Sequence, residues 1–91
     1  MKFQLTTAQA ANGTSLQGYI TTTYQRLIEI FGTPEYGGDK TTVTWCIEFA
    51  DGTVATIYDW KETTTPIDLH QWHVGGHTRK ALWHVIDLVD N

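Results

Sequence analysis

The chain has 91 residues, which is the length of one small domain, and a division into two domains would leave each half too short to bury its own core. Hydrophobic residues make up 41% and charged residues 18%, which is typical of a chain that folds. The single cysteine, Cys46, excludes an intramolecular disulfide, and the formal net charge of −4 argues against a general duplex-DNA binder. We therefore expect one domain over residues 1–91, in which residues 1–14 form a weakly structured extension or an edge strand.

Two further features of the sequence concern its place in the cell. No apolar run approaches the roughly 18 residues of a membrane span. Residues 1–7 lack the apolar stretch of a signal peptide. These features predict a protein of the cytoplasm with no membrane partner.

The first regular elements are expected between residues 16 and 31. A short strand is predicted over residues 16–20, before a run of three threonines. Apolar residues then follow the period of an amphipathic helix, at Tyr24, Leu27, Ile28 and Phe31. We expect Thr22 to cap this helix at its start, with Gly32 and Pro34 ending it.

A β-hairpin is predicted around Asp51-Gly52, which is a strong signal for a two-residue type I′ turn. That turn would place Phe49 opposite Val54 and set the rest of the register. The pairs that follow are Ile47 with Thr56, Trp45 with Tyr58, and Val43 with Trp60. Four aromatic side chains, those of Trp45, Phe49, Tyr58 and Trp60, would then gather on one face of the sheet.

The last two elements are a strand and a helix. The strand is expected over residues 69–74 and the helix after Thr78, with apolar residues at Leu82, Val85, Ile86 and Val89. The order is β-α-β-β-β-α. We expect an α+β fold with a small antiparallel sheet and two helices packed on one face.

The residues from Gly75 to Lys80 form the first candidate site. Two glycines are expected to break the strand and let the backbone approach a ligand, just before a helix start that favours anions. His77, Thr78, Arg79 and Lys80 would add donors. The basic side chains stand at the start of this helix and Asp87 and Asp90 near its end, which is the reverse of what the helix dipole favours. The alternative is a tight turn followed by ordinary exposed charges.

Three more residues are candidate ligand contacts. Trp60, near the end of its strand, and Tyr36, in a glycine-rich loop, could stack on a base. Asp59 could receive hydroxyl or amino groups of a ligand, or be solvated. Most of the other aromatic residues are expected in the core, because a small domain needs their buried area.

The sequence gives weaker signals for metal binding and for catalysis. The four histidines, at 70, 73, 77 and 84, lack the spacing of a zinc site, and Cys46 is the only thiol. Cys46 has no base beside it in sequence and is expected to be a buried, inert thiol, and no constellation of nucleophile, base and orienting group is visible. We expect no catalytic residue, no metal and no cofactor.

Several segments of the chain resemble a family of small bacteriophage proteins that are mostly described as hypothetical. The resemblance covers about residues 14–89 and is most specific at residues 51–61. The segments that carry it are residues 15–20 (SLQGYI), 24–27 (YQRL), 31–34 (FGTP), 51–61 (DGTVATIYDWK) and 72–77 (WHVGGH). The resemblance implies a phage origin and a place of action in the cytoplasm of the infected bacterial host. Small phage proteins of this kind are often counter-defence factors.

The resulting hypothesis is a non-enzymatic sponge that sequesters a nucleotide-type immune signal. The 75–80 segment would hold the phosphate, and aromatic residues at its rim would hold the base. The alternative is an anti-CRISPR-like inhibitor that acts by direct contact with a defence or host protein, which the net charge of −4 favours. Because a domain this small has few surfaces concave enough to enclose a nucleotide, we also expect a homo-oligomer with ligand sites near a subunit boundary.

Overall fold

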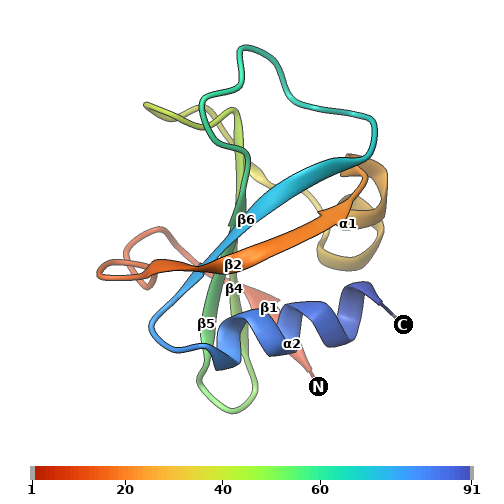
Figure 1. The fold of residues 1–91 in the computed structure, drawn as a ribbon. Coiled ribbons are helices and arrows are strands. Elements are labelled where there is room, and N and C mark those ends of the chain that lie inside the picture. The colour runs from red at the N-terminus through yellow and green to blue at the C-terminus, as the bar shows by residue number, and fades with distance from the viewer. Residues whose placement is uncertain (1, 91) are drawn as a thin grey trace.

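The structure, a computed structural model, describes residues 2–90, so the first and last residues of the predicted domain lie outside the described residues. Its chain order is a pair of strands, a helix, four strands and a final helix (Figure 1). The elements are β1 (Phe3–Leu5), β2 (Ser15–Thr22), α1 (Tyr24–Phe31), β3 (Glu35–Tyr36), β4 (Val43–Phe49), β5 (Val54–Tyr58), β6 (His70–Gly76) and α2 (Lys80–Val89). This is an α+β fold, as the sequence predicts.

The strands form one antiparallel sheet with the order β1-β4-β5-β6-β2, and the short β3 also pairs with β4. β2 therefore crosses over from the start of the chain to the far edge of the sheet, beside β6. Both helices lie on one face of the sheet (Figure 1), which we call the helix face. The opposite face, which we call the open face, is not covered by a helix.

The helix face carries the hydrophobic core. The indole rings of Trp45 and Trp72 are fully buried there, with ring centroids 5.7 Å apart. Each indole N–H donates to a main-chain carbonyl, that of Trp45 to Gly32 at 2.8 Å and that of Trp72 to Thr22 at 3.0 Å. These two bonds join the sheet to the two ends of α1, because Thr22 precedes the helix and Gly32 ends it.

The ends of α1 differ slightly from the prediction. The hydroxyl of Thr23, not that of Thr22, caps the helix by accepting from the N–H of Arg26 at 3.1 Å. Gly32 ends the helix with a φ of 87°, a region that only glycine adopts at little cost. Thr22 instead belongs to β2, which runs two residues further than expected.

The register of the β4–β5 hairpin is shifted by one residue from the prediction. The N–H of Phe49 donates to the carbonyl of Thr53 at 2.8 Å, and the N–H of Gly52 donates to Phe49 at 2.9 Å. The loop thus has three residues, with Gly52 at a φ of 88° and Asp51 outside the positive-φ region. The predicted type I′ turn is wrong, because a three-residue loop closed by a left-handed glycine also suits Asp51-Gly52.

The one-residue shift moves half of the hairpin to the other face. Trp45 lies opposite Ile57, and Thr44 lies opposite Tyr58. The predicted grouping of four aromatic residues on one face is therefore wrong. Trp45 and Phe49 belong to the core, whereas Tyr58 contacts Trp60 and His73 on the open face.

β1, at the start of the chain, is an edge strand of three residues. Across residues 2–90, neither helix has the length and hydrophobicity needed to cross a membrane.

Candidate functional site

The two glycines of the 75–80 segment lie inside β6 rather than in a turn. Gly75 and Gly76 pair with residues of both neighbouring strands, and neither has a positive φ. A Cβ at Gly76 would lie 2.3 Å from the Cβ of Ala81, at the start of α2. A Cβ at Gly75 would lie 2.5 Å from the hydroxyl of Thr56. The prediction that these glycines break the strand is wrong, because the second allows α2 to approach the sheet and the first allows close packing between strands.

The start of α2 is not arranged around an anion. The N–H groups of Ala81 and Leu82 donate to the carbonyls of Thr78 and Arg79, at 3.2 and 3.1 Å. The Arg79 side chain, at the N-cap, makes no capping hydrogen bond. These backbone donors are therefore already used within the chain, and the glycines that were expected to cradle a phosphate are buried.

His77, Thr78 and Lys80 do line a shallow hollow of about 260 Å³, together with the β4–β5 loop. The loop contributes Asp51, whose carboxylate lies 2.8 Å from the Nε2 of His84. A hydrogen bond from the N–H of Thr53, and then the contact with His84, hold the pKa of Asp51 well below its usual range. This hollow thus contains a carboxylate that stays ionised, which opposes a second anion.

The carboxylate of Asp59 is buried and accepts hydrogen bonds from within the fold. Its side chain is fully buried, and its oxygens accept from the N–H of Thr42 at 2.8 Å, the hydroxyl of Thr42 at 2.6 Å and the N–H of Val43 at 3.2 Å. The Thr42 hydroxyl also lies 2.8 Å from that of Thr65. Asp59 therefore joins the start of β4 to the loop after β5, and the predicted contact of this carboxylate with a ligand is not compatible with its burial.

Trp60 and Tyr36 lie on opposite faces of the sheet. Tyr36 pairs with Val43 of the core, and its hydroxyl lies 3.3 Å from that of Tyr24 on α1. Trp60 follows Tyr58 and packs against it on the open face. Trp60 lies beyond one end of β5, whereas Gly75 and Gly76 pair with Thr56 and Ala55 toward its other end, about 13–17 Å away at 3.3 Å per residue. The structure therefore does not bring the predicted phosphate and base contacts together.

The open face instead carries an aromatic cluster that sequence reasoning missed. We call it the open-face cluster: Tyr19 of β2, Tyr58 of β5, His73 of β6 and Trp60. The His73 ring is its centre, with centroids 4.9 Å from Tyr19, 5.3 Å from Tyr58 and 6.2 Å from Trp60. The Nζ of Lys61 lies 5.9 Å from the centroid of the Trp60 ring. The correct hairpin register would have placed Tyr58 on this face, but its contacts with Tyr19 and His73 depend on the pairing of β6 with β2 and β5.

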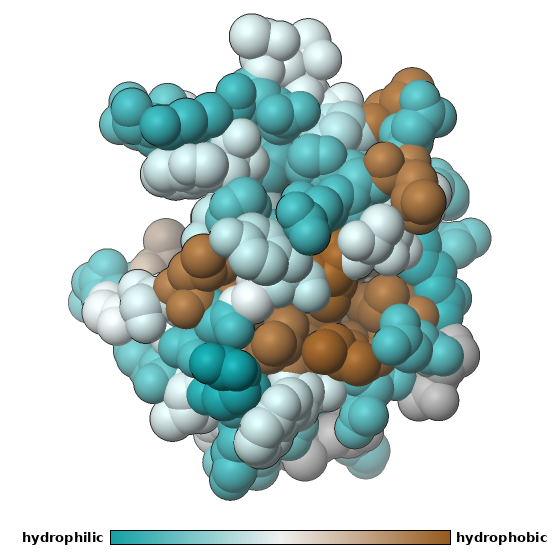
Figure 2. All heavy atoms as spheres, viewed as in Figure 1, coloured by the Kyte–Doolittle hydropathy of each residue, from teal (hydrophilic) through white to brown (hydrophobic). Residues whose placement is uncertain are grey.

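A hollow of about 300 Å³ lies beside the open-face cluster and shares Tyr58 with it. Its lining residues are uncharged, and many bear hydroxyl groups: Thr14, Ser15, Thr41, Thr44, Thr56 and Tyr58. One wall comes from the segment between β1 and β2, and the floor comes from the strands. In Figure 2 the molecule is notched at its left edge, between the loops that precede β2 and β4 in Figure 1.

Burial shifts the pKa values of three groups of this region, His73, Tyr58 and Cys46, in the direction that favours their neutral forms. Burial, and then the nearby His70, lower the pKa of His73, and its Nδ1 is buried without a hydrogen-bond partner among the described residues. Burial, and then Tyr19, raise the pKa of the Tyr58 hydroxyl. Cys46 lines the hollow, and burial followed by the charge of Glu35 raises the pKa of its thiol. A protonated thiol is a poor nucleophile.

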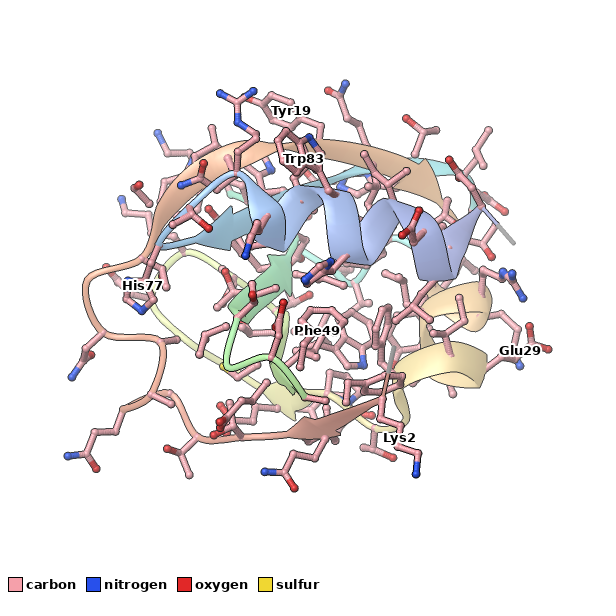
Figure 3. The ribbon with its side chains drawn as sticks, turned by 90° about the horizontal axis from the view of Figure 1, so that it is seen from below. Lys2, Tyr19, Glu29, Phe49, His77 and Trp83 are labelled. Carbon is pink, nitrogen blue, oxygen red and sulfur yellow. The ribbon has the colours of Figure 1, made fainter. Side chains whose placement is uncertain are left out.

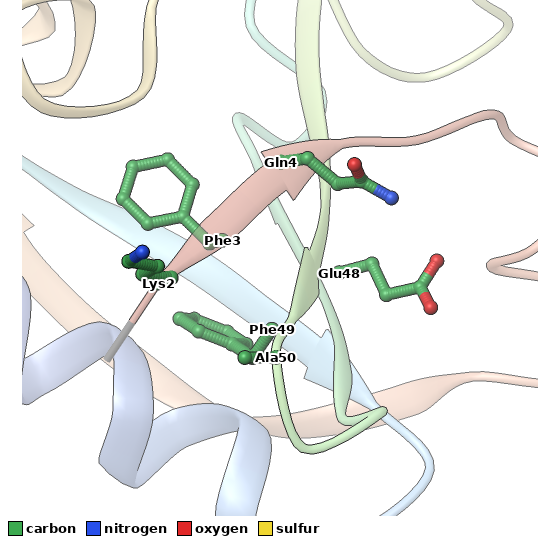
Figure 4. Close-up of a pocket in the computed structure, with 6 residues that line it drawn as sticks. All are labelled: Lys2, Phe3, Gln4, Glu48, Phe49 and Ala50. Atoms are coloured by element: carbon green, nitrogen blue, oxygen red, sulfur yellow. The ribbon is translucent and has the colours of Figure 1, made fainter.

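Another hollow, of about 410 Å³, lies at the β1 edge of the sheet. Figure 4 shows that its side chains diverge: the Phe3 and Phe49 rings lie on one side of the strands, and the Gln4 and Glu48 side chains point to the other. The two phenyl rings pack with centroids 6.2 Å apart. This hollow has no set of convergent polar groups, which a small-molecule site needs.

Within residues 2–90, no three His, Cys, Asp or Glu side chains come together in a way that could hold a metal ion.

Comparison of the chain with protein-family models, with curated proteins and with solved structures finds no match.

Proposed function

We propose that this protein binds a nucleotide-type small molecule on the open face of its sheet and sequesters it without catalysis. The observation that carries the proposal is the open-face cluster beside the hydroxyl-lined hollow. Exposed aromatic rings on a sheet surface offer stacking to any base, because every base has a π-face. Trp60 and Tyr19 are 42% and 47% exposed, so their rings are available to a ligand.

The chemistry of the hollow suits the remaining parts of a nucleotide. Hydroxyl groups can both donate to and accept from ribose hydroxyls, and they donate to phosphate oxygens. Lys61, beside the Trp60 ring, supplies a cation at the rim. The main chain of Lys40 lies next to it, since the Lys40 carbonyl accepts from the N–H of Lys61 at 2.8 Å. A base on Trp60 and a phosphate near these lysines would lie within the reach of one nucleotide.

The absence of catalysis is part of the proposal, and the ionisation of the open face supports it. The Cys46 thiol and the Tyr58 hydroxyl both have raised pKa values, and so are poor nucleophiles at neutral pH. His73, the candidate base nearest to the hollow, is held by ring contacts. Binding without turnover is what a sponge requires.

The biological role follows from the resemblance to small bacteriophage proteins. We propose that the ligand is a nucleotide signal of a bacterial defence system, and that the protein acts in the cytoplasm of the infected host. Of the 75–80 segment, Gly75 lines the hollow beside the open-face cluster. The predicted phosphate contacts at Arg79 and Lys80 are not retained in this proposal, because the residues that follow Gly76 line a different hollow.

A second candidate function is the inhibition of a defence or host protein by direct contact. The observation that favours it is the exposure of two large apolar side chains in the loop between β5 and β6. Ile67 is 72% exposed and Leu69 is 71% exposed, although neither contributes to the core. Exposed apolar groups of this kind are typical of protein contacts when they lie together.

The proposal can be tested by calorimetric titration with a panel of cyclic dinucleotides and nucleoside monophosphates. We expect at least one member to bind the parent chain. Trp60→Ala should weaken that binding by about tenfold or more, because stacking on one base is worth about 1–3 kcal/mol. Tyr36→Ala is the matched control, since Tyr36 is also an exposed aromatic residue but lies on the helix face. We expect it to bind like the parent.

Native mass spectrometry separates the two candidate functions. After incubation with lysate from a bacterium whose defence has been activated, a small-molecule adduct that Trp60→Ala abolishes would support sequestration. Capture of a protein that requires Ile67 and Leu69, without any small-molecule adduct, would replace the first proposal by the second. Equal binding of nucleotide by the Trp60→Ala and parent chains would place the ligand elsewhere and overturn the proposed site.

A further inference from the structure

The two edges of the sheet are very different. At one edge, β1 has three residues and β3 has two, so few backbone groups are left unpaired. At the other edge, β2 has eight residues and pairs only with β6 among the described strands. β2 also contains no charged residue and no proline, which are the usual means of protecting an edge strand. Its one irregularity is a bulge between Leu16 and Gly18.

Exposed side chains of α2 lie beside this edge. Figure 3 shows Trp83 and Tyr19 at the same margin of the molecule, and Lys2 at the opposite margin. Trp83 is 59% exposed, although tryptophan is costly to leave in water. α2 runs in the same direction as β2, as Figures 1 and 3 both show. The β2 edge and the exposed side of α2 therefore form one continuous surface.

The charges on α2 have a simple pattern along its exposed side. Arg79 and Lys80 precede Trp83, and Asp87 and Asp90 follow it, all exposed. Within one chain this order is unfavourable, because basic groups lie at the positive end of the helix dipole and acidic groups at the negative end. Between two antiparallel copies of α2 the same order is favourable. Each basic end would then face the acidic end of the other copy, with Trp83 at the centre.

We propose that two copies of this chain form a dimer in which β2 pairs antiparallel with β2 and α2 lies antiparallel to α2. The partner at the β2 edge is thus a second copy of the chain, because the opposite charges at the two ends of α2 make this helix complementary to an antiparallel copy of itself. One two-fold axis can serve both contacts. Gly18, near the middle of β2, lies against Leu82, the residue before Trp83, since a Cβ at Gly18 would be 2.6 Å from a methyl group of Leu82.

The dimer would also extend the open face across both subunits. Tyr19 lies near the axis and belongs to the open-face cluster, so two clusters would lie on one continuous sheet. The dimer does not depend on ligand binding. The test of the dimer is the assembly state of the ligand-free chain. The dimer can therefore be refuted while nucleotide binding holds, and nucleotide binding can be refuted while the dimer holds.

The first test is the mass of the parent chain by sedimentation equilibrium across a range of micromolar concentrations. The monomer has a mass of 10.3 kDa, and we expect a species of twice that mass. Trp83→Ala should raise the dissociation constant by about tenfold, because exposed tryptophans at the centre of an interface dominate its energy. The fold should survive, since the side chain is mostly exposed, and circular dichroism would confirm it. A parent chain that remains monomeric overturns the proposal.

The second test uses charge reversal to identify the surface. The double variant Arg79→Glu/Lys80→Glu makes the exposed side of α2 wholly acidic, and Asp87→Lys/Asp90→Lys makes it wholly basic. Each variant alone should be monomeric, because like charges would meet across the axis. An equimolar mixture of the two should form a heterodimer, which native mass spectrometry distinguishes by mass. Two variants that dimerise alone as well as the parent, or that fail to pair when mixed, would show that the copies meet elsewhere and would overturn the proposed geometry.

Discussion

The two faces of the sheet use aromatic residues in opposite ways. On the helix face, Trp45 and Trp72 are fully buried and their N–H groups are bonded to main-chain carbonyls. On the open face, Tyr19 and Trp60 remain nearly half exposed around His73. The difference arises because a two-layer domain has helices for only one side of its sheet. Aromatic residues on the covered side stabilise the fold, whereas those on the other side are available for recognition.

The largest expected contrast between the faces is in stability. Trp72→Ala should lower the free energy of unfolding by about 3–5 kcal/mol, since it removes a buried ring and leaves a cavity. Tyr19→Ala, on the open face, should lower it by about 1 kcal/mol or less. Urea denaturation followed by circular dichroism measures both. Similar losses for the two variants would mean that the open face is packed against something in solution.

Asp59 and Trp60, which are adjacent in sequence, allow the same contrast between a residue that stabilises the fold and one that is available for recognition. Asp59→Ala leaves the part-buried N–H of Thr42 and the buried N–H of Val43 without their acceptor, which should cost about 2–3 kcal/mol. Trp60→Ala should cost far less stability but impair nucleotide binding. Thermal melting and calorimetric titration of both variants would separate the roles. If Asp59→Ala kept full stability and lost binding, Asp59 would be a ligand contact after all.

Adding one methyl group at Gly75 or at Gly76 compares how tightly the two faces of β6 are packed. Gly76→Ala would force a Cβ against Ala81 of α2 and close to the carbonyl of Val54, so the loss should be about 1–3 kcal/mol. Gly75→Ala meets the hydroxyl of Thr56, which can rotate away, so a smaller loss is expected. Melting temperatures of the two variants provide the measurement. A larger effect at Gly75 would indicate that the open face is the more tightly packed one.

The smallest expected effect is a pH dependence at the β4–β5 loop. The hydrogen bond from Thr53 and the contact with His84 lower the pKa of Asp51 in the folded state. A lowered pKa gives stability that is present above the unfolded value of about 4 and is lost as the pH falls through the folded value. The parent should therefore melt slightly higher than Asp51→Asn at neutral pH, with the difference vanishing in strong acid. A difference that persists in acid would have to come from the loop geometry instead of the charge.

Local patterns were enough to predict the helices and the fold class. The apolar residues from Tyr24 to Phe31 coincide with α1, and those after Thr78 coincide with α2, whose start is at Lys80. A helix is specified by neighbours three and four residues apart, so its signal lies within one short segment. The antiparallel sheet with both helices on one face followed from burying the two apolar stripes.

The hairpin shows why the candidate site was harder to predict. Asp51-Gly52 is compatible with a loop of two residues or of three, and the local sequence does not separate these. The choice exchanges the faces of β5 relative to β4, so a single residue of register decides whether Tyr58 lies in the core or on the surface. The strand β3 was missed for a related reason, since two residues carry no period.

The sequence by itself determined the two helices, the hairpin at residues 51–52 and the fold class, because each of these depends on composition or on contacts between near neighbours. Only the tertiary structure decided which residues share a face. The open-face cluster joins Tyr19, Tyr58 and His73, which come from β2, β5 and β6. The burial of Asp59 and the burial of Gly76 beneath α2 depend on pairings of the same kind. These contacts link distant segments, and their register is fixed by the packing of the whole sheet against the helices.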